Sequence, residues 1–147
     1  MQISSKKAFT MVELVFVIVV IGILAAIAVP KFAATRDDAL ITRGMATLAS
    51  VRSAIATERQ KRILRGDFTD ITDLGGTEGG TNYVFSHFDG NTSSPRVLEY
   101  PLKSGTNSGD WERSDETTYY FHYFGGGRCD YNLTKNRLDG TCAEFGD

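Results

Sequence analysis

Histidine and cysteine are both scarce in this sequence, with two residues of each among 147. The histidines are His87 and His122, and neither has zinc-ligand spacing to the cysteines, Cys129 and Cys142. Both histidines lie among aromatic residues in strand-like segments, which favours a structural role for each. The sequence also shows no pattern that would place a Ser, His and Asp triad. It therefore gives an enzyme little support.

Charge is absent from a long stretch near the N-terminus, apart from one carboxylate. Glu13 is the only charged residue from Phe9 to Val29, a span of twenty-one residues. A bilayer core needs about 20 helical residues, so this stretch has the length of a membrane helix. The pair Lys6-Lys7 precedes it and is expected to stay in the cytoplasm by the positive-inside rule. The pattern predicts a single-pass membrane protein with a cytoplasmic N-terminus.

Glu13 is the unusual residue of this stretch. A carboxylate inside a bilayer costs about 2.5–3.5 kcal/mol on insertion scales and needs a partner or a proton. The next basic residue is Lys31, about five helical turns away. A cut between Ala8 and Phe9 would create a cationic amine at Phe9 that could pair with Glu13 of the same chain or of another copy. A lone membrane anchor has no evident need of Glu13, whereas docking between copies would use it.

A secretory signal peptide cut after Ala26 or Ala28 is an alternative explanation of the apolar stretch. It is the weaker one, because the stretch is long for a signal and a cleavable signal has no use for a carboxylate at its start.

The order Lys6-Lys7-Ala8-Phe9-Thr10-x-x-Glu13-Leu14, followed by a long apolar run, resembles the N-terminus of type IV pilins and type II secretion pseudopilins. The resemblance covers roughly the first 35 residues. It implies that a prepilin peptidase cuts between Ala8 and Phe9 and methylates the amine of Phe9. It also implies that Glu13 guides assembly by pairing with a neighbour's N-terminus. The family usually has Gly before the cut, so Ala8 implies slower processing.

The resemblance implies a structural subunit that resides in the inner membrane and then joins a periplasmic or extracellular filament. The implied partners are copies of itself and related pilins, the prepilin peptidase, an inner-membrane assembly platform and membrane lipid. The main alternative is a single-pass, membrane-anchored periplasmic binding or sensor domain that does not polymerise. The absence of a Tyr-Pro-Thr-rich segment after the helix weakens the secretion pseudopilin within the family.

The chain divides into a leader (1–8), a transmembrane and assembly helix (9–30), an amphipathic helix (31–65) and a β-rich head (66–147). Gly22 and Pro30 are expected to kink or break the helix. Beyond Pro30 an apolar stripe predicts the face that packs under a sheet, and Gly66 is expected to cap the helix end. The stripe consists of Ile41, Met45, Leu48, Val51 and Ile55.

Strand signals follow in the head at 83–88, 96–100, 117–124, 131–134 and 137–138, the last two forming a hairpin around Lys135-Asn136. The predicted fold is α+β, a long N-terminal helix packed under a small antiparallel sheet of three to five strands. Both cysteines, Cys129 and Cys142, follow the membrane segment. An even number of cysteines in an exported domain favours a disulfide, so these two are expected to form one. No cofactor is implied.

Charge is unevenly distributed, with a net +5 from Lys31 to Arg65 and a net −8 from Gly66 onward. This asymmetry suggests charge-guided packing between copies, with a solvated helix and an acidic surface as the simpler explanation. Four bases between 59 and 65 are only a weak signal for nucleic acid. An acidic loop is the weak candidate for calcium, again less favoured than a solvated loop. Its carboxylates are Asp110, Glu112, Asp115 and Glu116.

Two triplets match the acceptor pattern for asparagine-linked glycans, although such triplets are frequent by chance. They are Asn91-Thr-Ser93 and Asn132-Leu-Thr134.

Overall fold

A computed structural model describes residues 9–78 and 81–145, so the predicted leader (1–8) lies outside the described residues. The chain forms two compact units, Met1–Arg36 and Asp37–Asp147. The first contains the N-terminal part of helix α1 (Met11–Leu64), and the second contains the rest of α1 and the head. The predicted α+β class is confirmed.

Helix α1 is continuous through Gly22 and Pro30. The helix does not end at Pro30, so only the kink expected of this residue stays a prediction. Its segment Met11–Val29 has a mean hydropathy of 3.1 and no buried part. By length and composition this segment can cross a membrane.

The C-terminus of α1 is capped by Gly66, as predicted. Gly66 has a φ of 79°, a conformation that glycine adopts without strain. The N–H of Asp67 donates to the carbonyl of Arg62 at 2.9 Å, and the N–H of Gly66 donates to that of Ile63 at 3.0 Å. These two bonds are those of a Schellman motif, which satisfies carbonyls that the helix end would leave unpaired.

One face of the C-terminal half of α1 forms the floor of the head's core. Leu48, Val51 and Ile55 are buried there, as the predicted stripe requires. Met45 was wrongly placed on this face, because it is 44% exposed. Gly44 is buried in its place, and the ring of Phe121 packs so closely that a Cβ on Gly44 would lie 2.5 Å from it.

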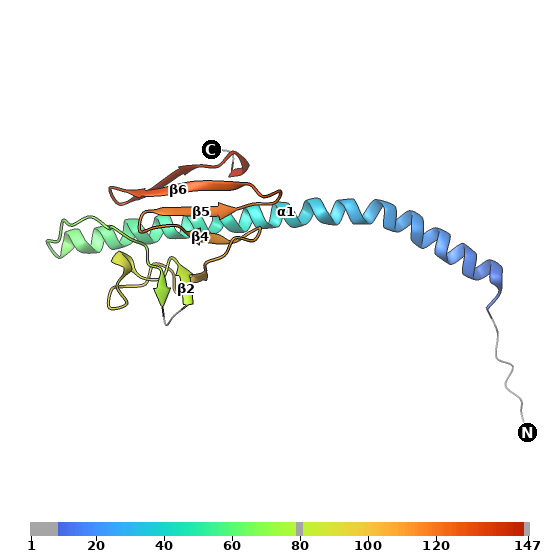
Figure 1. Ribbon diagram of the computed structural model, residues 1–147, viewed down its shortest axis with the longest axis horizontal. Coiled ribbons are helices and arrows are strands. Elements are labelled where there is room, and N and C mark those ends of the chain that lie inside the picture. Colours follow the sequence, from blue (N-terminus) through green and yellow to red (C-terminus); the bar gives the residue numbers. More distant parts are fainter. Residues whose placement is uncertain (1–8, 79–80, 146–147) are drawn as a thin grey trace, which may run out of the picture. The chain divides into compact units, whose positions relative to one another are not determined.

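A four-stranded antiparallel sheet covers this face, in the order β4-β5-β6-β7. Figure 1 shows β4, β5 and β6 running along the C-terminal half of α1. The sheet meets the expectation of three to five strands on the helix. Its strands are β4 (Trp111–Arg113), β5 (Thr118–His122), β6 (Arg128–Thr134) and β7 (Arg137–Thr141).

The hairpin between β6 and β7 is confirmed. Lys135 and Asn136 have φ values of 49° and 63°, the left-handed pair that suits the twist of a two-residue hairpin loop. The disulfide between Cys129 and Cys142 is also confirmed, and it joins β6 to the residue after β7 with a Cα–Cα distance of 5.0 Å.

A smaller three-stranded sheet has the order β1-β2-β3 and the strands β1 (Thr77–Glu78), β2 (Thr81–Val84) and β3 (Leu102–Lys103). The strand predicted at 83–88 is wrong at its end, because Phe85 has a φ of 60° and the chain leaves the extended conformation there. The strand predicted at 96–100 is reduced to one bridge between Arg96 and His87. Short 3₁₀ helices lie at Phe88–Gly90 (η1) and Ala143–Phe145 (η2).

Aromatic side chains fill the core between the layers. Trp111 lies 5.2 Å from Phe85 and from Phe121, and 5.4 Å from Tyr131, between ring centroids. All four rings are at most 2% exposed. Burial of Trp111 turns part of the predicted acidic loop into strand β4, because its backbone must pair with β5 when its indole enters the core.

Candidate functional site

The candidate site is the N-terminal part of α1, where the apolar side chains are exposed instead of packed in a core. Phe9 is 82% exposed and Met11 is 84% exposed. Every large apolar side chain from Leu14 to Val29 is also exposed, by 38% to 69%. An apolar surface of this extent requires a cover, either lipid or protein.

Thr10 and Glu13 begin this helix together. The backbone N–H of Glu13 donates to Thr10 Oγ1 at 3.2 Å. In return Glu13 Oε2 accepts from the backbone N–H of Thr10 at 3.4 Å and from its hydroxyl at 3.3 Å. This reciprocal arrangement is a capping box, which satisfies backbone donors that a helix start leaves unpaired. Its signature, Thr10-x-x-Glu13, is readable in the sequence but was not among the features predicted from it.

The capping box gives Glu13 a second role, at the start of its own helix. A carboxylate in the first turn also meets the positive end of the helix dipole, so Glu13 has a stabilising role within a single chain. The expectation that an anchor has no need of Glu13 is therefore too strong. The box supplies donors but no positive charge, so it leaves the carboxylate available to a cationic partner. The predicted pairing with the amine of Phe9 stays a prediction.

Bases predicted for the basic stalk bind other residues of the head, and Arg62 is buried there. Arg62 is 6% exposed and Glu58 is 3% exposed, on the same face of α1 as the apolar core. Arg62 Nε lies 3.2 Å from Glu58 Oε1, and Arg62 Nη2 also binds Asp89 of η1. Burial alone would lower the pKa of Arg62, but its bonds to Asp89 and Glu58 outweigh burial and raise it. Arg65 adds a contact to Glu58 at 3.3 Å.

These contacts bear on nucleic-acid binding. Arg59 donates to the carbonyl of Thr69 at 2.9 Å, so three of the four bases between 59 and 65 have partners in their own chain. Basic side chains that already have partners are poor ligands for phosphate, which weakens the hypothesis of nucleic-acid binding further. The same pairing leaves fewer bases for charge-guided packing between copies.

Asp73 holds a second buried polar group together. Its Oδ2 lies 2.6 Å from Arg113 Nη2, and its Oδ1 lies 3.0 Å from the hydroxyl of Tyr119. The Tyr119 hydroxyl also accepts from the N–H of Leu74 at 2.9 Å. Burial, reinforced by the negative charge of Asp73, raises the pKa of Tyr119 above its ordinary value. This network ties the loop before β1 to the main sheet.

The four weak calcium candidates do not converge. Asp110 accepts from Asn107, and Glu112 contacts His122 across β4 and β5 at 2.8 Å. Asp115 accepts N–H bonds from the turn that follows it, which lower its pKa. Within residues 9–78 and 81–145 no three His, Cys, Asp or Glu side chains are grouped to hold a metal ion. The contact with Glu112 is consistent with the structural role predicted for His122, which stays a prediction.

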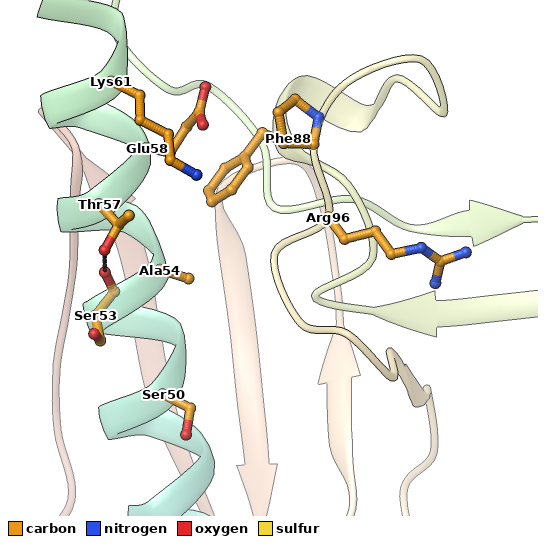
Figure 2. A pocket seen from close by; sticks show the side chains of 9 residues that line it. Ser50, Ser53, Ala54, Thr57, Glu58, Lys61, Phe88 and Arg96 are labelled. Atoms are coloured by element: carbon orange, nitrogen blue, oxygen red, sulfur yellow. Dashed lines mark hydrogen bonds between the residues drawn. The ribbon is translucent and has the colours of Figure 1, made fainter. Parts of the chain in front are cut away.

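A groove of about 490 Å³ lies between α1 and the segment that follows β2. Figure 2 shows Glu58 and Lys61 near Phe88, while the side chain of Arg96 extends away from the helix. The Thr57 hydroxyl donates to the carbonyl of Ser53 at 2.9 Å, so it serves the helix itself. The groove offers no nucleophile paired with a base. Its lining is Ser50, Ser53, Ala54, Thr57, Glu58, Lys61, Phe88, Pro95 and Arg96.

Comparison with known proteins gives matches at the N-terminus and beyond it. Residues 3–29 match the family model described as the prokaryotic N-terminal methylation motif. The type IV narrow pilus major component PilA5 of Thermus thermophilus is 45% identical over 82 residues, 54% of this chain and 71% of that protein. The type IV major fimbrial protein FimA of Dichelobacter nodosus is 30% identical over 102 residues, 69% of this chain and 60% of that protein. A fimbrial protein of Pseudomonas aeruginosa is 36% identical over 63 residues, 43% and 38% respectively. No solved structure matches the chain.

Proposed function

The chain belongs to the type IV pilin family, and from this membership we propose that it polymerises through its N-terminal helix into a type IV pilus-like filament. It is a structural subunit and not an enzyme. The observation that carries the proposal is the uncovered apolar surface of Met11–Val29 with one carboxylate at its start. Lipid covers this surface while the subunit is stored, and neighbouring helices cover it in the filament.

Processing is the first step of this proposal. A prepilin peptidase cuts between Ala8 and Phe9 and methylates the new amine. The amine of one subunit then approaches Glu13 of its neighbour. A charge removed from water without its partner is unfavourable, so docking in register, which pairs the two charges, is favoured. An inner-membrane platform adds subunits that lie in the membrane with the N-terminus in the cytoplasm. The filament extends into the periplasm or beyond it.

A pilus is the form of filament that we favour. The relatives reported above are named as pilus or fimbrial proteins, which supports a pilus over a type II secretion pseudopilus. The missing Tyr-Pro-Thr-rich segment after the helix points the same way.

A non-polymerising membrane anchor is the second candidate, and the capping box is the observation that favours it. If Glu13 serves only to start the helix, its charge is unnecessary and no neighbour needs to bind it. The two candidates therefore differ in whether assembly depends on the charge of Glu13 or only on the cap.

Two substitutions separate the charge from the cap. Glutamine can replace glutamate at this position of a capping box, so Glu13→Gln keeps the cap and removes the charge. Glu13→Ala removes both. We expect both variants to insert in the membrane and neither to form filaments, measured by shear recovery and electron microscopy beside membrane fractionation.

Wild-type filament yield from Glu13→Gln, with loss only in Glu13→Ala, would assign Glu13 to the cap and overturn the charge-pairing proposal. Normal filaments from both variants would exclude any role of Glu13 in assembly.

The cut is tested by the mass of the mature N-terminus. We expect the chain to begin at Phe9 and to carry one methyl group, with a fraction of uncut precursor in the membrane because Ala8 replaces the usual glycine. Ala8→Gly is the matched control and should reduce that fraction. A mature protein that retains Met1, or that begins after Ala28, contradicts the processing step.

A further inference from the structure

The two glycan-acceptor triplets lie outside the proposed assembly surface, and the asparagine of each is exposed. Such triplets are modified in exported proteins, where a bulky polar glycan is tolerated on the surface. The inference drawn from them rests on the proposed function, which places the head outside the cytoplasm. The structure gives the two triplets very different surroundings.

Asn91 follows the short helix η1, and Asn91, Thr92 and Ser93 are all exposed. The Oδ1 of Asn91 accepts from the backbone N–H of Ser93 at 2.9 Å. The N–H of Ser94 donates to the carbonyl of Asn91 at 2.8 Å, and Asn91 N–H donates to Phe88 at 3.4 Å. Within the described part of the chain these bonds of the triplet are all local. The triplet therefore lies in a surface turn that an enzyme can bind without opening a sheet.

Both ends of this turn are anchored. Phe88 is 2% exposed and lines the groove beside α1, and the bridge between His87 and Arg96 closes the base of the loop. Figure 2 shows the chain leaving the groove after Phe88 and returning to it before Arg96. A glycan at the tip would thus extend from a fixed base and displace no core side chain.

Asn132 lies in the middle of β6, an interior strand of the main sheet. It pairs with Thr118 of β5 on one side and with Asp139 of β7 on the other. Its Oδ1 also accepts from the Thr118 hydroxyl at 3.2 Å. The next residues on either side, Tyr131 and Leu133, are 0% and 4% exposed. Bringing this triplet into an enzyme would require separation of β6 from both neighbours.

We propose that Asn91 is glycosylated on its amide nitrogen after the head has folded, and that Asn132 is not. The co-reactant is an oligosaccharide linked to a polyprenyl diphosphate in the membrane. A bond forms between Nδ2 of Asn91 and the anomeric carbon of the sugar, and the bond from that carbon to the diphosphate oxygen breaks. The lipid diphosphate leaves with the bonding electrons, and the amide proton passes to a base of the transferase.

The experiment uses mature protein sheared from its own cells. After reduction, trypsin separates the two triplets, because basic residues flank each of them. Asn91 lies in the fragment 66–96 and Asn132 in the fragment 129–135. We expect mass spectrometry to find a glycan mass on the first fragment and an unmodified second fragment.

Two variants of one residue give a matched control. Ser93→Ala destroys the acceptor pattern without changing Asn91, and we expect complete loss of the glycan mass. Ser93→Thr keeps the pattern and should keep the glycan. Asn132→Gln should leave the total mass of the glycan unchanged.

An unmodified fragment 66–96, a glycan on the fragment 129–135, or a glycan that persists in Ser93→Ala would each overturn the proposal. The N-terminal fragment from the same digest reports independently on the cut at Phe9. Detection of a methylated Phe9 together with an unmodified Asn91 would therefore contradict the glycosylation proposal and leave the proposed function standing.

Discussion

Tyr119 shows how one side chain joins parts of the head that are distant in sequence. Its ring is fully buried against Phe85, with 5.3 Å between centroids, while its hydroxyl reaches Asp73 and Leu74. The apolar ring of Tyr119 packs in the core, while its hydroxyl forms hydrogen bonds with polar groups of the loop. Aromatic content at 117–124 predicted a buried strand, but the polar partner lies 46 residues away in a loop.

Tyr119→Phe is expected to lower the free energy of unfolding at neutral pH by about 1–3 kcal/mol, because Leu74 N–H and Asp73 lose a buried partner. The pKa of Tyr119 is raised in the folded state. Its contribution is therefore fully present below the unfolded pKa of about 10 and falls as pH rises toward the folded pKa. Denaturant unfolding between pH 7 and 11 should show the gap between wild type and variant narrowing above pH 10.

Tyr100→Phe provides the control, since Tyr100 is 83% exposed. A gap for Tyr119→Phe that is constant across this pH range would contradict the assigned role of its hydroxyl.

At the scale of elements, α1 serves two environments with one helix. Its first part is apolar on all sides, as a surface within lipid or among other helices requires. Its second part buries one face, and that face changes from apolar at Val51 and Ile55 to charged at Glu58 and Arg62. Burial of the charged pair is feasible because Asp89 completes it.

At Gly44 this helix approaches the sheet closely, because a Cβ there would lie 2.5 Å from the Phe121 ring. Gly44→Ala should gain about 1 kcal/mol of helix propensity, but overpacking against the Phe121 ring costs about 1–3 kcal/mol. The ring is fully buried and has little room to move. We expect a net loss of head stability, measured by denaturant unfolding.

Adding Phe121→Leu to the Gly44→Ala variant should remove part of the clash. The two substitutions together should then destabilise the head less than the sum of their separate effects. An increase in stability for Gly44→Ala alone would show that the Phe121 ring moves to make room for the added methyl group.

At the scale of the whole molecule, the head contains a complete core of its own. The buried apolar cluster runs from Leu48 to Cys142, and all of it lies within the unit Asp37–Asp147. The membrane-length segment contributes nothing to that cluster. The surface that we propose for storage and assembly thus lies outside the unit that contains this core.

A fragment comprising residues 37–147 is therefore expected to be soluble, monomeric and cooperatively folded. Reducing the bond between Cys129 and Cys142 should lower its free energy of unfolding by about 3 kcal/mol, the value for a loop of this length. Sedimentation and denaturant unfolding with and without reductant give the test. An aggregated or unfolded oxidised fragment would show that the head depends on the first part of α1.

The sequence by itself determined the elements whose signals are local. The charge-free run, the cap at Gly66 and the hairpin at Lys135-Asn136 depend on neighbouring residues and on backbone conformations that few residue types adopt. The stripe at Leu48, Val51 and Ile55 follows from helical period. The capping box of Thr10 and Glu13 is equally local and was readable.

Only the tertiary structure decided which polar groups meet and which triplet lies in a surface turn rather than in an interior strand. Arg62 finds Asp89, and Arg113 finds Asp73, across 27 and 40 residues, because packing of the loops on α1 brings them together. Trp111 became part of a strand for the same reason. Composition made its loop look solvated, whereas burial of one indole required its backbone to pair. Contacts between distant residues depend on the whole packed arrangement, and no local pattern specifies them.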